Sequence, residues 1–193
     1  MKQGYLVVIS APSGTGKTTI CKELLKRNKN WKFSISATTR NQRNTEKDGV
    51  DYIFMNKDKF NHYAKFGDFV EWEWVHGHQY GTLIGPLEES LSNKDVMLLD
   101  VDVKGGYNIR DEFEENVISI FIEPPGENVS DQLLILEDRL IKRGNENATL
   151  IKQRLRRFEN EMNYKKRFEH HFVNENLDEV VKEIEKTIKG SLK

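Results

Sequence analysis

Hydrophobic residues gather in four short, nearly continuous runs along the chain. They cover residues 5–9, 96–100, 117–122 and 172–173. Runs of this length and composition are typical of parallel strands that are buried on both faces. The second run ends in the carboxylate of Asp100, and two prolines stop the third. We therefore expect buried parallel strands, with a functional side chain at the end of the second.

Segments with helical periodicity separate these runs. The pattern predicts helices over about residues 18–25, 57–65, 86–91 and 130–164, the last broken near residues 143–145. An apolar stripe from Leu177 to Ile188 predicts a closing amphipathic helix. Strands that alternate with helices imply an α/β fold with a parallel sheet flanked by helices.

A block with a different pattern, residues 34–84, interrupts this alternation. Residues 33–36 alternate like a half-buried strand, residues 52–54 and 69–75 also read as strands, and a tight turn at Gly77 reverses the chain. We expect a small mixed α/β region inserted into the parent fold. Its aromatic and arginine side chains suit a binding surface.

A glycine-rich loop follows the first predicted strand directly. It consists of Ala11, Pro12, Ser13, Gly14, Thr15, Gly16, Lys17 and Thr18. A strand, this loop and a helix in sequence form the context that a phosphate-binding P-loop requires. Backbone N–H groups can surround an anion, and the start of the helix adds its positive dipole end. Lys17 can reach the β- and γ-phosphates, and the Thr18 hydroxyl can ligate Mg²⁺.

Each of these features also has a plainer interpretation. The loop departs from the pattern G-x-x-x-x-G-K-[ST] at Ala11, which costs little if the backbone φ is negative. The alternative to a P-loop is a tight strand-to-helix turn with an ordinary lysine. Asp100 resembles a Walker-B carboxylate that holds Mg²⁺, and the alternative is an aspartate that caps a strand end. The agreement of strand, loop and helix favours a nucleoside triphosphate site.

Arginines form two groups that could neutralise phosphate. Arg40 and Arg43 lie in the inserted block, whereas Arg139 and Arg143 share one helical face and Arg154 lies on the next helical segment. Phosphoryl transfer needs positive charge around the moving group, and guanidinium groups bind phosphate through two parallel hydrogen bonds. Taken singly, each arginine could equally be a solvated surface charge.

Composition and charge exclude several classes of function. Lys+Arg 30 and Asp+Glu 31 leave a formal net charge of −1 over 193 residues, which argues against a general nucleic-acid binder. Cys21 is the only cysteine, so we expect no intrachain disulfide and no cysteine-rich metal site. No apolar segment approaches the length of a membrane span. We expect a cytoplasmic protein without a membrane or nucleic-acid partner.

Several motifs together resemble the guanylate kinase family, from Tyr5 to about Asp178. These motifs are Phe33-Ser34-Ile35-Ser36-Ala37-Thr38-Thr39-Arg40-x-x-Arg43-x-x-Glu46, Gly49-x-Asp51-Tyr52-x-Phe54, Phe69-Val70-Glu71-Trp72, Tyr80-Gly81-Thr82, Leu99-Asp100-Val101-Asp102-x-x-Gly105, Arg139-Leu140-x-x-Arg143-Gly144 and the pair Arg154-Leu155. The resemblance implies transfer of the ATP γ-phosphoryl group to GMP, giving ADP and GDP. Mg²⁺ is the implied cofactor, and GMP recycling in purine metabolism is the implied role.

The resemblance also implies roles for matched positions. ATP would contact the loop from Ala11 to Thr18 together with Thr19 and Asn174. Catalysis would involve Lys17, Arg40, Arg139, Arg143 and Arg154. GMP would be held by Ser36, Arg40, Arg43, Tyr52, Glu71, Tyr80, Thr82 and Asp102. Mg²⁺ would contact Thr18 and Asp100.

Elementary chemistry supports the role of Glu71. Guanine presents N1–H and N2–H₂ as adjacent donors, and one carboxylate can accept hydrogen bonds from both. Adenine has an acceptor at N1, so a buried carboxylate there would be left unpaired, and sites built on buried hydrogen bonds reject such analogues strongly. The alternative for Glu71 is an edge-strand charge beside Trp72.

The chain departs from the family pattern in two further places. Residues 126–138 form a longer segment than is usual before the first lid arginine, so the alignment of Arg139 depends on the Arg-Leu-x-x-Arg-Gly pattern. Lys104 stands where the family often has glutamine.

We expect one domain that is a monomer or a homodimer. Its core would comprise residues 1–33, 85–125 and 158–193, with a GMP-binding region over 34–84 and a helical lid over 126–157. Two other functions compete with this interpretation. A different small-molecule kinase would not need Glu71 with Tyr80-Gly81-Thr82. A binding module without catalysis would not need Lys17, Thr18 and Arg40.

Overall fold

The computed structural model describes residues 3–75, 77–143 and 148–192, with Arg143 described by its backbone alone. In chain order the elements are β1 (Tyr5–Ser10), α1 (Lys17–Arg27), β2 (Lys32–Phe33), β3 (Ala37–Thr38), β4 (Ile53–Phe54), α2 (Lys57–Phe66), β5 (Phe69–Val75), β6 (His78–Leu83), α3 (Ile84–Ser92), β7 (Val96–Asp100), α4 (Val103–Phe113), β8 (Val117–Glu123), α5 (Val129–Arg143), α6 (Ala148–Leu155), α7 (Phe158–Asn163), β9 (His170–Val173) and α8 (Leu177–Ser191). Short 3₁₀ turns cover Glu114–Asn116 and Lys165–Arg167.

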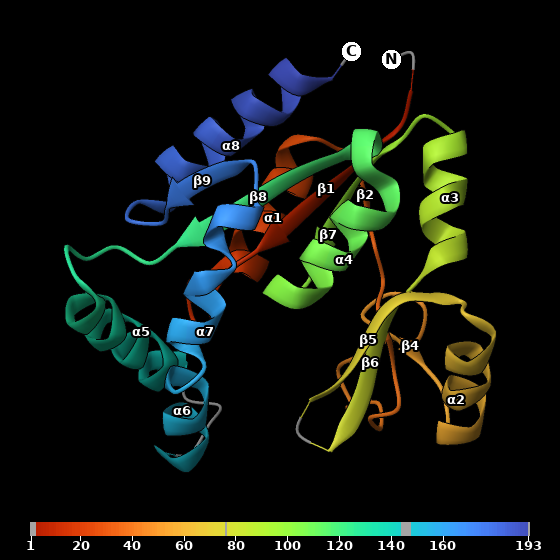
Figure 1. The fold of residues 1–193 in the computed structure, drawn as a ribbon, viewed down its shortest axis with the longest axis horizontal. Helices are drawn as coiled ribbons and strands as arrows, with labels where there is room; N and C mark the ends of the chain where they lie inside the picture. The colour runs from red at the N-terminus through yellow and green to blue at the C-terminus, as the bar shows by residue number, and fades with distance from the viewer. Residues whose placement is uncertain (1–2, 76, 144–147, 193) are drawn as a thin grey trace.

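Within the described residues the main sheet has five parallel strands in the order β2-β7-β1-β8-β9 (Figure 1). Ile9 at the end of β1 lies opposite Asp100 at the end of β7. The glycine-rich loop therefore leaves the sheet directly beside the Asp100 carboxylate. The predicted parallel sheet flanked by helices is confirmed.

Alternating side chains of β1 build a core on each face of the main sheet. Val7 and Ile9 pack into a buried cluster with residues of α1 and α8, such as Leu24 and Ile184. Leu6 and Val8 belong to a second cluster with residues of α3 and α4. Complete burial of both faces explains why the sequence of this strand is an unbroken apolar run.

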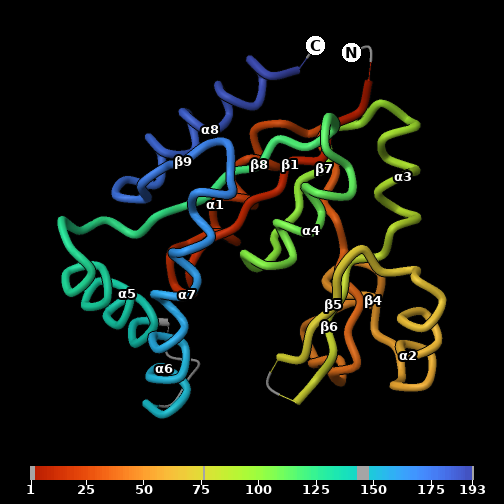
Figure 2. The backbone as a smooth tube through the Cα atoms, viewed as in Figure 1, coloured from red at the N-terminus to blue at the C-terminus, as the bar shows by residue number. Residues whose placement is uncertain are grey.

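A second, mixed sheet in the order β4-β3-β6-β5 forms the inserted region. Helix α2 covers it, and Phe60 of α2 stacks on Phe69 of β5 with ring centroids 4.4 Å apart. Figures 1 and 2 show this region and the pair α5–α6 below the main sheet, on opposite sides of α4. The predicted inserted mixed sheet is confirmed.

The predicted strand over residues 33–36 is wrong beyond Phe33, because residues 34–36 connect the two sheets and belong to no strand. Phe33 ends β2 in the main sheet, where Ser34 N donates to Leu98 O at 2.9 Å. Ser36 O accepts from Ile53 N of the second sheet at 2.9 Å, and β3 begins at Ala37. The chain crosses from one sheet to the other within these residues, which a local alternating pattern does not reveal.

Two helical features refine the prediction. The broken helix over residues 130–164 is three helices, α5, α6 and α7, and part of the predicted break lies outside the described residues. No helix was predicted over α4, whose first turn contains Gly105 and Gly106. A Cβ on Gly106 would lie 2.5 Å from Ser10 Oγ, so close packing against β1 requires a residue that lowers helix propensity.

Among the described helices, none combines the length and the hydropathy needed to cross a membrane.

Candidate active site

The glycine-rich loop wraps the start of α1 and opens into a cavity of about 430 Å³. Gly14 and Gly16 have φ angles of 94° and 104°, in the left-handed region where side chains are strained. Gly16 is the N-cap of α1, so the free N–H groups of that helix point into the loop. The cavity is lined by Ala11 to Thr18 and by Arg43, Tyr52, Val75, Tyr80, Asp100, Asp102, Arg154, Arg157 and Glu161.

Asp100 contacts two side chains of the loop, those of Lys17 and Thr18. Lys17 Nζ lies 3.0 Å from Asp100 Oδ1 and donates to Val101 O at 2.5 Å. Burial lowers the pKa of Lys17, but the Asp100 carboxylate together with Asp102 and Cys21 raises it, and the net shift is upward. Lys17 is therefore a charged ammonium at neutral pH.

The Thr18 hydroxyl donates to Asp100 Oδ2 at 2.6 Å. Two hard oxygen ligands are thus close together at the cavity wall, which suits Mg²⁺, an ion that typically binds one or two protein oxygens plus phosphate. Within the described residues, no group of three or more His, Cys, Asp or Glu side chains could hold a metal ion. The two oxygens of Thr18 and Asp100 fit a Mg²⁺ ion whose other ligands come from outside the protein.

Asn174 and Arg139 hold the P-loop from its outer side. Asn174 Nδ2 donates to Thr15 O at 2.6 Å, and Arg139 donates to Thr15 O at 3.2 Å and to Asn174 O at 2.9 Å. A Cβ on Gly14 would lie 3.3 Å from Leu140 Cγ, so α5 packs directly on the loop. In the described residues neither Arg139 nor the exposed Thr19 lines the cavity, and the side chain of Arg143 lies outside the description.

Arg40 is held beside the cavity by a carboxylate and three rings. Its guanidinium donates to Glu46 at 2.9 and 2.7 Å and to Tyr80 Oη at 3.2 Å. The Arg40 Cζ atom lies 5.3 Å from the Tyr52 ring centroid and 5.6 Å from that of Phe54. The hydrogen bond to Glu46 raises the pKa of Arg40, and the same contact lowers the pKa of Glu46. The planar group is thereby fixed in orientation and charge.

The other predicted phosphate ligands of GMP share the cavity with the P-loop. Arg43, Tyr52 and Tyr80 all line it, and the two tyrosine rings meet edge-on with centroids 5.9 Å apart. Ser36 lines a neighbouring cavity of about 480 Å³ together with Thr18, Tyr52 and Asp100. Residues of the inserted region and of the P-loop thus line the same cavity.

Glu71 of β5 is a half-buried carboxylate aimed at the start of α4. It accepts a hydrogen bond from Thr82 Oγ1 at 2.6 Å. Burial raises the pKa of Glu71 to about 7, with smaller upward contributions from Asp102 and Glu73, whereas the Thr82 hydrogen bond lowers it. A Cβ on Gly105 would lie 2.9 Å from Glu71 Oε2, so the glycine leaves room for this carboxylate.

Asp102 stands at the N-cap of α4, where Oδ1 accepts from Gly105 N at 2.7 Å. Burial and a hydrogen bond with Asp102 raise the pKa of Glu73, and Lys104 Nζ lies 3.8 Å from Glu73 Oε1. The unusual Lys104 is therefore an ion-pair partner of Glu73.

Three site residues had no predicted role. Glu46 orients Arg40, and its spacing in the motif Arg40-x-x-Arg43-x-x-Glu46 was a usable signal. Arg157 and Glu161 line the cavity from the segment that begins α7. They belong to a run of charged residues that resembles any solvated helix surface, so the sequence alone did not distinguish them.

Comparison with known proteins identifies the family. The family model described as guanylate kinase matches residues 3–191. The chain belongs to the guanylate kinase family. A guanylate kinase of Chlorobium chlorochromatii is 44% identical over 185 residues, which cover 96% of this chain and 94% of that protein. A guanylate kinase of Thermotoga maritima is 39% identical over 179 residues, which cover 93% of this chain and 83% of that protein.

A solved structure agrees with these relatives. The crystal structure of guanylate kinase from Anaplasma phagocytophilum superposes with a TM-score of 0.77 at 28% identity, covering 98% of this chain and 87% of that one. The predicted family, fold class and enzyme class are therefore confirmed. The roles predicted for single residues and the boundaries of core, GMP-binding region and lid stay predictions.

Proposed function

We propose that this guanylate kinase family member transfers the γ-phosphoryl group of ATP to GMP with Mg²⁺, giving ADP and GDP. One observation supports this most strongly: the P-loop and the acceptor-side residues Arg43, Tyr52 and Tyr80 line the same cavity. Direct transfer needs the donor and acceptor phosphates in one water-poor space, roughly in line. An arrangement with two separate phosphate sites would not satisfy that requirement.

On the donor side, the P-loop amides and the charged Lys17 are the proposed ligands of the ATP phosphates. Thr18 and Asp100 would hold Mg²⁺, which would neutralise charge that develops on the transferring group. Lys17 would exchange its Asp100 contact for phosphate oxygens. Asn174 and Arg139 support the loop from behind, and we assign Asn174 to the adenine end of the ATP site.

On the acceptor side, Arg40, Arg43, Tyr52 and Tyr80 are the proposed ligands of the GMP phosphate. The ionised Glu71 would accept from guanine N1–H and N2–H₂, with Ser36, Thr82 and Asp102 around the base. A buried carboxylate that must find two donors discriminates against adenine, since adenine presents an acceptor at N1. This is the physical basis for selecting GMP.

The reaction needs no protein general base. A phosphate monoester is already largely dianionic at neutral pH, with a second pKa of about 6. The protein therefore contributes position and positive charge. We propose that the GMP-binding region, residues 34–84, and the lid, residues 126–157, close over the two nucleotides and bring Arg139, Arg143 and Arg154 to the phosphates. Closure would exclude water that could otherwise hydrolyse ATP.

The proposal places the enzyme in purine nucleotide metabolism, where it would recycle GMP in the cytoplasm. A coupled ADP-release assay with GMP, dGMP, AMP, CMP and UMP, each with and without Mg²⁺, tests it. We expect Mg²⁺-dependent release with GMP that exceeds release with AMP by at least about a hundredfold, because adenine would leave the buried Glu71 carboxylate unpaired. Equal turnover of AMP would contradict the proposal.

A further inference from the structure

Glu161 of α7 stands in the wall of the P-loop cavity together with two other acidic residues, Asp100 and Asp102. Glu161 of α7 is half-buried, and its Oε2 atom accepts from Ser13 N of the P-loop at 3.2 Å. Arg154 of α6 donates to Ser13 Oγ at 3.1 Å. The segment α6–α7 thus holds Ser13 through both a backbone and a side-chain contact.

The position of Glu161 is unexpected for a residue that merely lines a triphosphate site. The amides of a P-loop are donors for phosphate oxygens. The Glu161 carboxylate accepts a hydrogen bond from Ser13 N. It therefore offers this donor an anionic oxygen, as a phosphate would. Once a triphosphate enters, however, this carboxylate and the phosphates compete for one N–H and repel each other in a partly desolvated space.

Three groups around Glu161 favour its ionised form against the effect of burial. Burial raises the pKa of Glu161 and the net shift is upward, although the Ser13 amide, Arg157 and Lys17 each lower it. These three partners are the groups that would also stabilise phosphate in the same cavity. Asp102 is the one acidic neighbour that opposes the charge.

We propose that Glu161 is an internal substitute for phosphate, which occupies Ser13 N in the nucleotide-free enzyme and is displaced when the donor nucleotide binds. This inference rests on the proposed donor site at the P-loop. Glu161 follows Arg154 and Arg157 on the same segment, so its release frees that segment to move. Donor binding is thereby linked to the position of the arginines, and part of the binding free energy is used to displace Glu161.

The variant Glu161→Gln tests this competition. The amide keeps the shape but removes the charge, and Glu161→Ala removes the acceptor altogether. When a site is available only part of the time, the apparent dissociation constant rises in proportion. We expect both variants to bind the Mg²⁺ complex of a non-hydrolysable β,γ-imido ATP analogue about three- to tenfold more tightly than the wild type. Affinity for GMP, measured without the analogue, should stay within about twofold.

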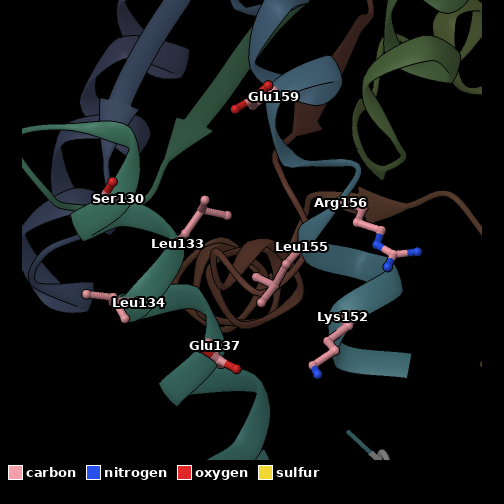
Figure 3. Close-up of a pocket in the computed structure, with 8 residues that line it drawn as sticks. All are labelled: Ser130, Leu133, Leu134, Glu137, Lys152, Leu155, Arg156 and Glu159. Atoms are coloured by element: carbon pink, nitrogen blue, oxygen red, sulfur yellow. The ribbon is translucent and has the colours of Figure 1, made fainter. Parts of the chain in front are cut away.

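Glu159 supplies a matched control. It lies on the same helix and carries the same charge, but it is exposed and lines a different cavity of about 700 Å³ between α5, α6 and α7 (Figure 3). That cavity also contains Leu133 and Leu155 and includes no P-loop residue. Glu159→Gln should leave the affinity for the analogue unchanged within about twofold, which excludes a general effect of net charge.

The outcomes separate this inference from the proposed function. Tighter binding of the analogue by both Glu161 variants supports the substitute role, because damage to the fold weakens binding and does not tighten it. Unchanged or weaker binding overturns it, and so does equal tightening in Glu159→Gln. Failure of the donor site itself has a different signature, since Lys17→Ala would then bind the analogue as tightly as the wild type does.

Discussion

The affinity for GMP should depend on pH through Glu71. Burial raises the pKa of this carboxyl to about 7, so the acid and the carboxylate coexist near neutral pH in the free enzyme. Only the ionised form offers acceptors to both guanine N1–H and N2–H₂. With a pKa of about 7, the ionised fraction rises from roughly 10% at pH 6 to roughly 90% at pH 8. The Glu71 contribution to GMP affinity should therefore increase about tenfold over this interval.

Glu71→Gln isolates that contribution. Each charge-assisted hydrogen bond contributes about 1.5–3 kcal/mol, so the variant should bind GMP at least about tenfold more weakly than the wild type at pH 8. At pH 6 most wild-type molecules carry a neutral Glu71, and the difference should shrink by about five- to tenfold. Calorimetric titration of GMP without ATP at pH 6, 7 and 8 measures both ratios. The phosphate of GMP titrates identically for both proteins and cancels from the comparison.

Stability provides an independent check of the same pKa. The folded-state pKa of Glu71 lies above its unfolded value of 4.5, so the folded protein binds more protons between pH 4.5 and about 7 and loses stability as pH rises through that window. The shift corresponds to a destabilisation of about 3 kcal/mol at pH 8. Glu71→Gln should therefore unfold at a higher temperature than the wild type at pH 8 without GMP. A ratio of GMP affinities that is constant from pH 6 to 8, together with a less stable variant, would refute this reasoning.

Three further changes test other parts of the site. Lys17→Ala should reduce kcat by at least about a hundredfold and leave GMP binding without ATP nearly intact, because the ammonium acts on the transferring group; near-normal kcat in steady-state assays would oppose this role. Gly105→Ala should raise KM for GMP at least about threefold while the fold is retained, since the new Cβ would lie 2.9 Å from Glu71 Oε2. Gly85→Ala is the control and should leave KM unchanged, because nothing lies within 4 Å of its Cβ. Asp100→Asn should raise the Mg²⁺ concentration needed for half-maximal activity by at least about threefold, and an unchanged Mg²⁺ dependence would remove Asp100 from the metal site.

The sequence predicted the features that depend on local pattern. Apolar runs located the buried strands β1, β7 and β8, because strands covered on both faces need hydrophobic residues throughout. The spacing of glycines, Lys17 and Thr18 located the P-loop, because backbone geometry and phosphate chemistry restrict those positions. The motifs shared with one family located Glu71 and Arg40.

Contacts between distant segments were not predictable in the same way. Glu161 accepts a hydrogen bond from Ser13 N, which lies 148 positions earlier in the chain. No local pattern at either residue predicts this contact. Helix α4 was missed because Gly106 serves the packing against β1 at the expense of helix propensity. The end of β2 at Phe33 and the crossing of residues 34–36 to the second sheet likewise depend on partners elsewhere in the chain.

The most direct test of guanine recognition removes the partner of Glu71 from the substrate. Inosine monophosphate keeps N1–H and lacks the 2-amino group, so it can donate only one of the two proposed hydrogen bonds. The ratio of kcat/KM for GMP to that for inosine monophosphate should be at least about tenfold in the wild type at pH 8. In Glu71→Gln the ratio should fall to about twofold or less. An equal ratio in both proteins would show that Glu71 does not read the 2-amino group, and would contradict the account of how this enzyme selects GMP.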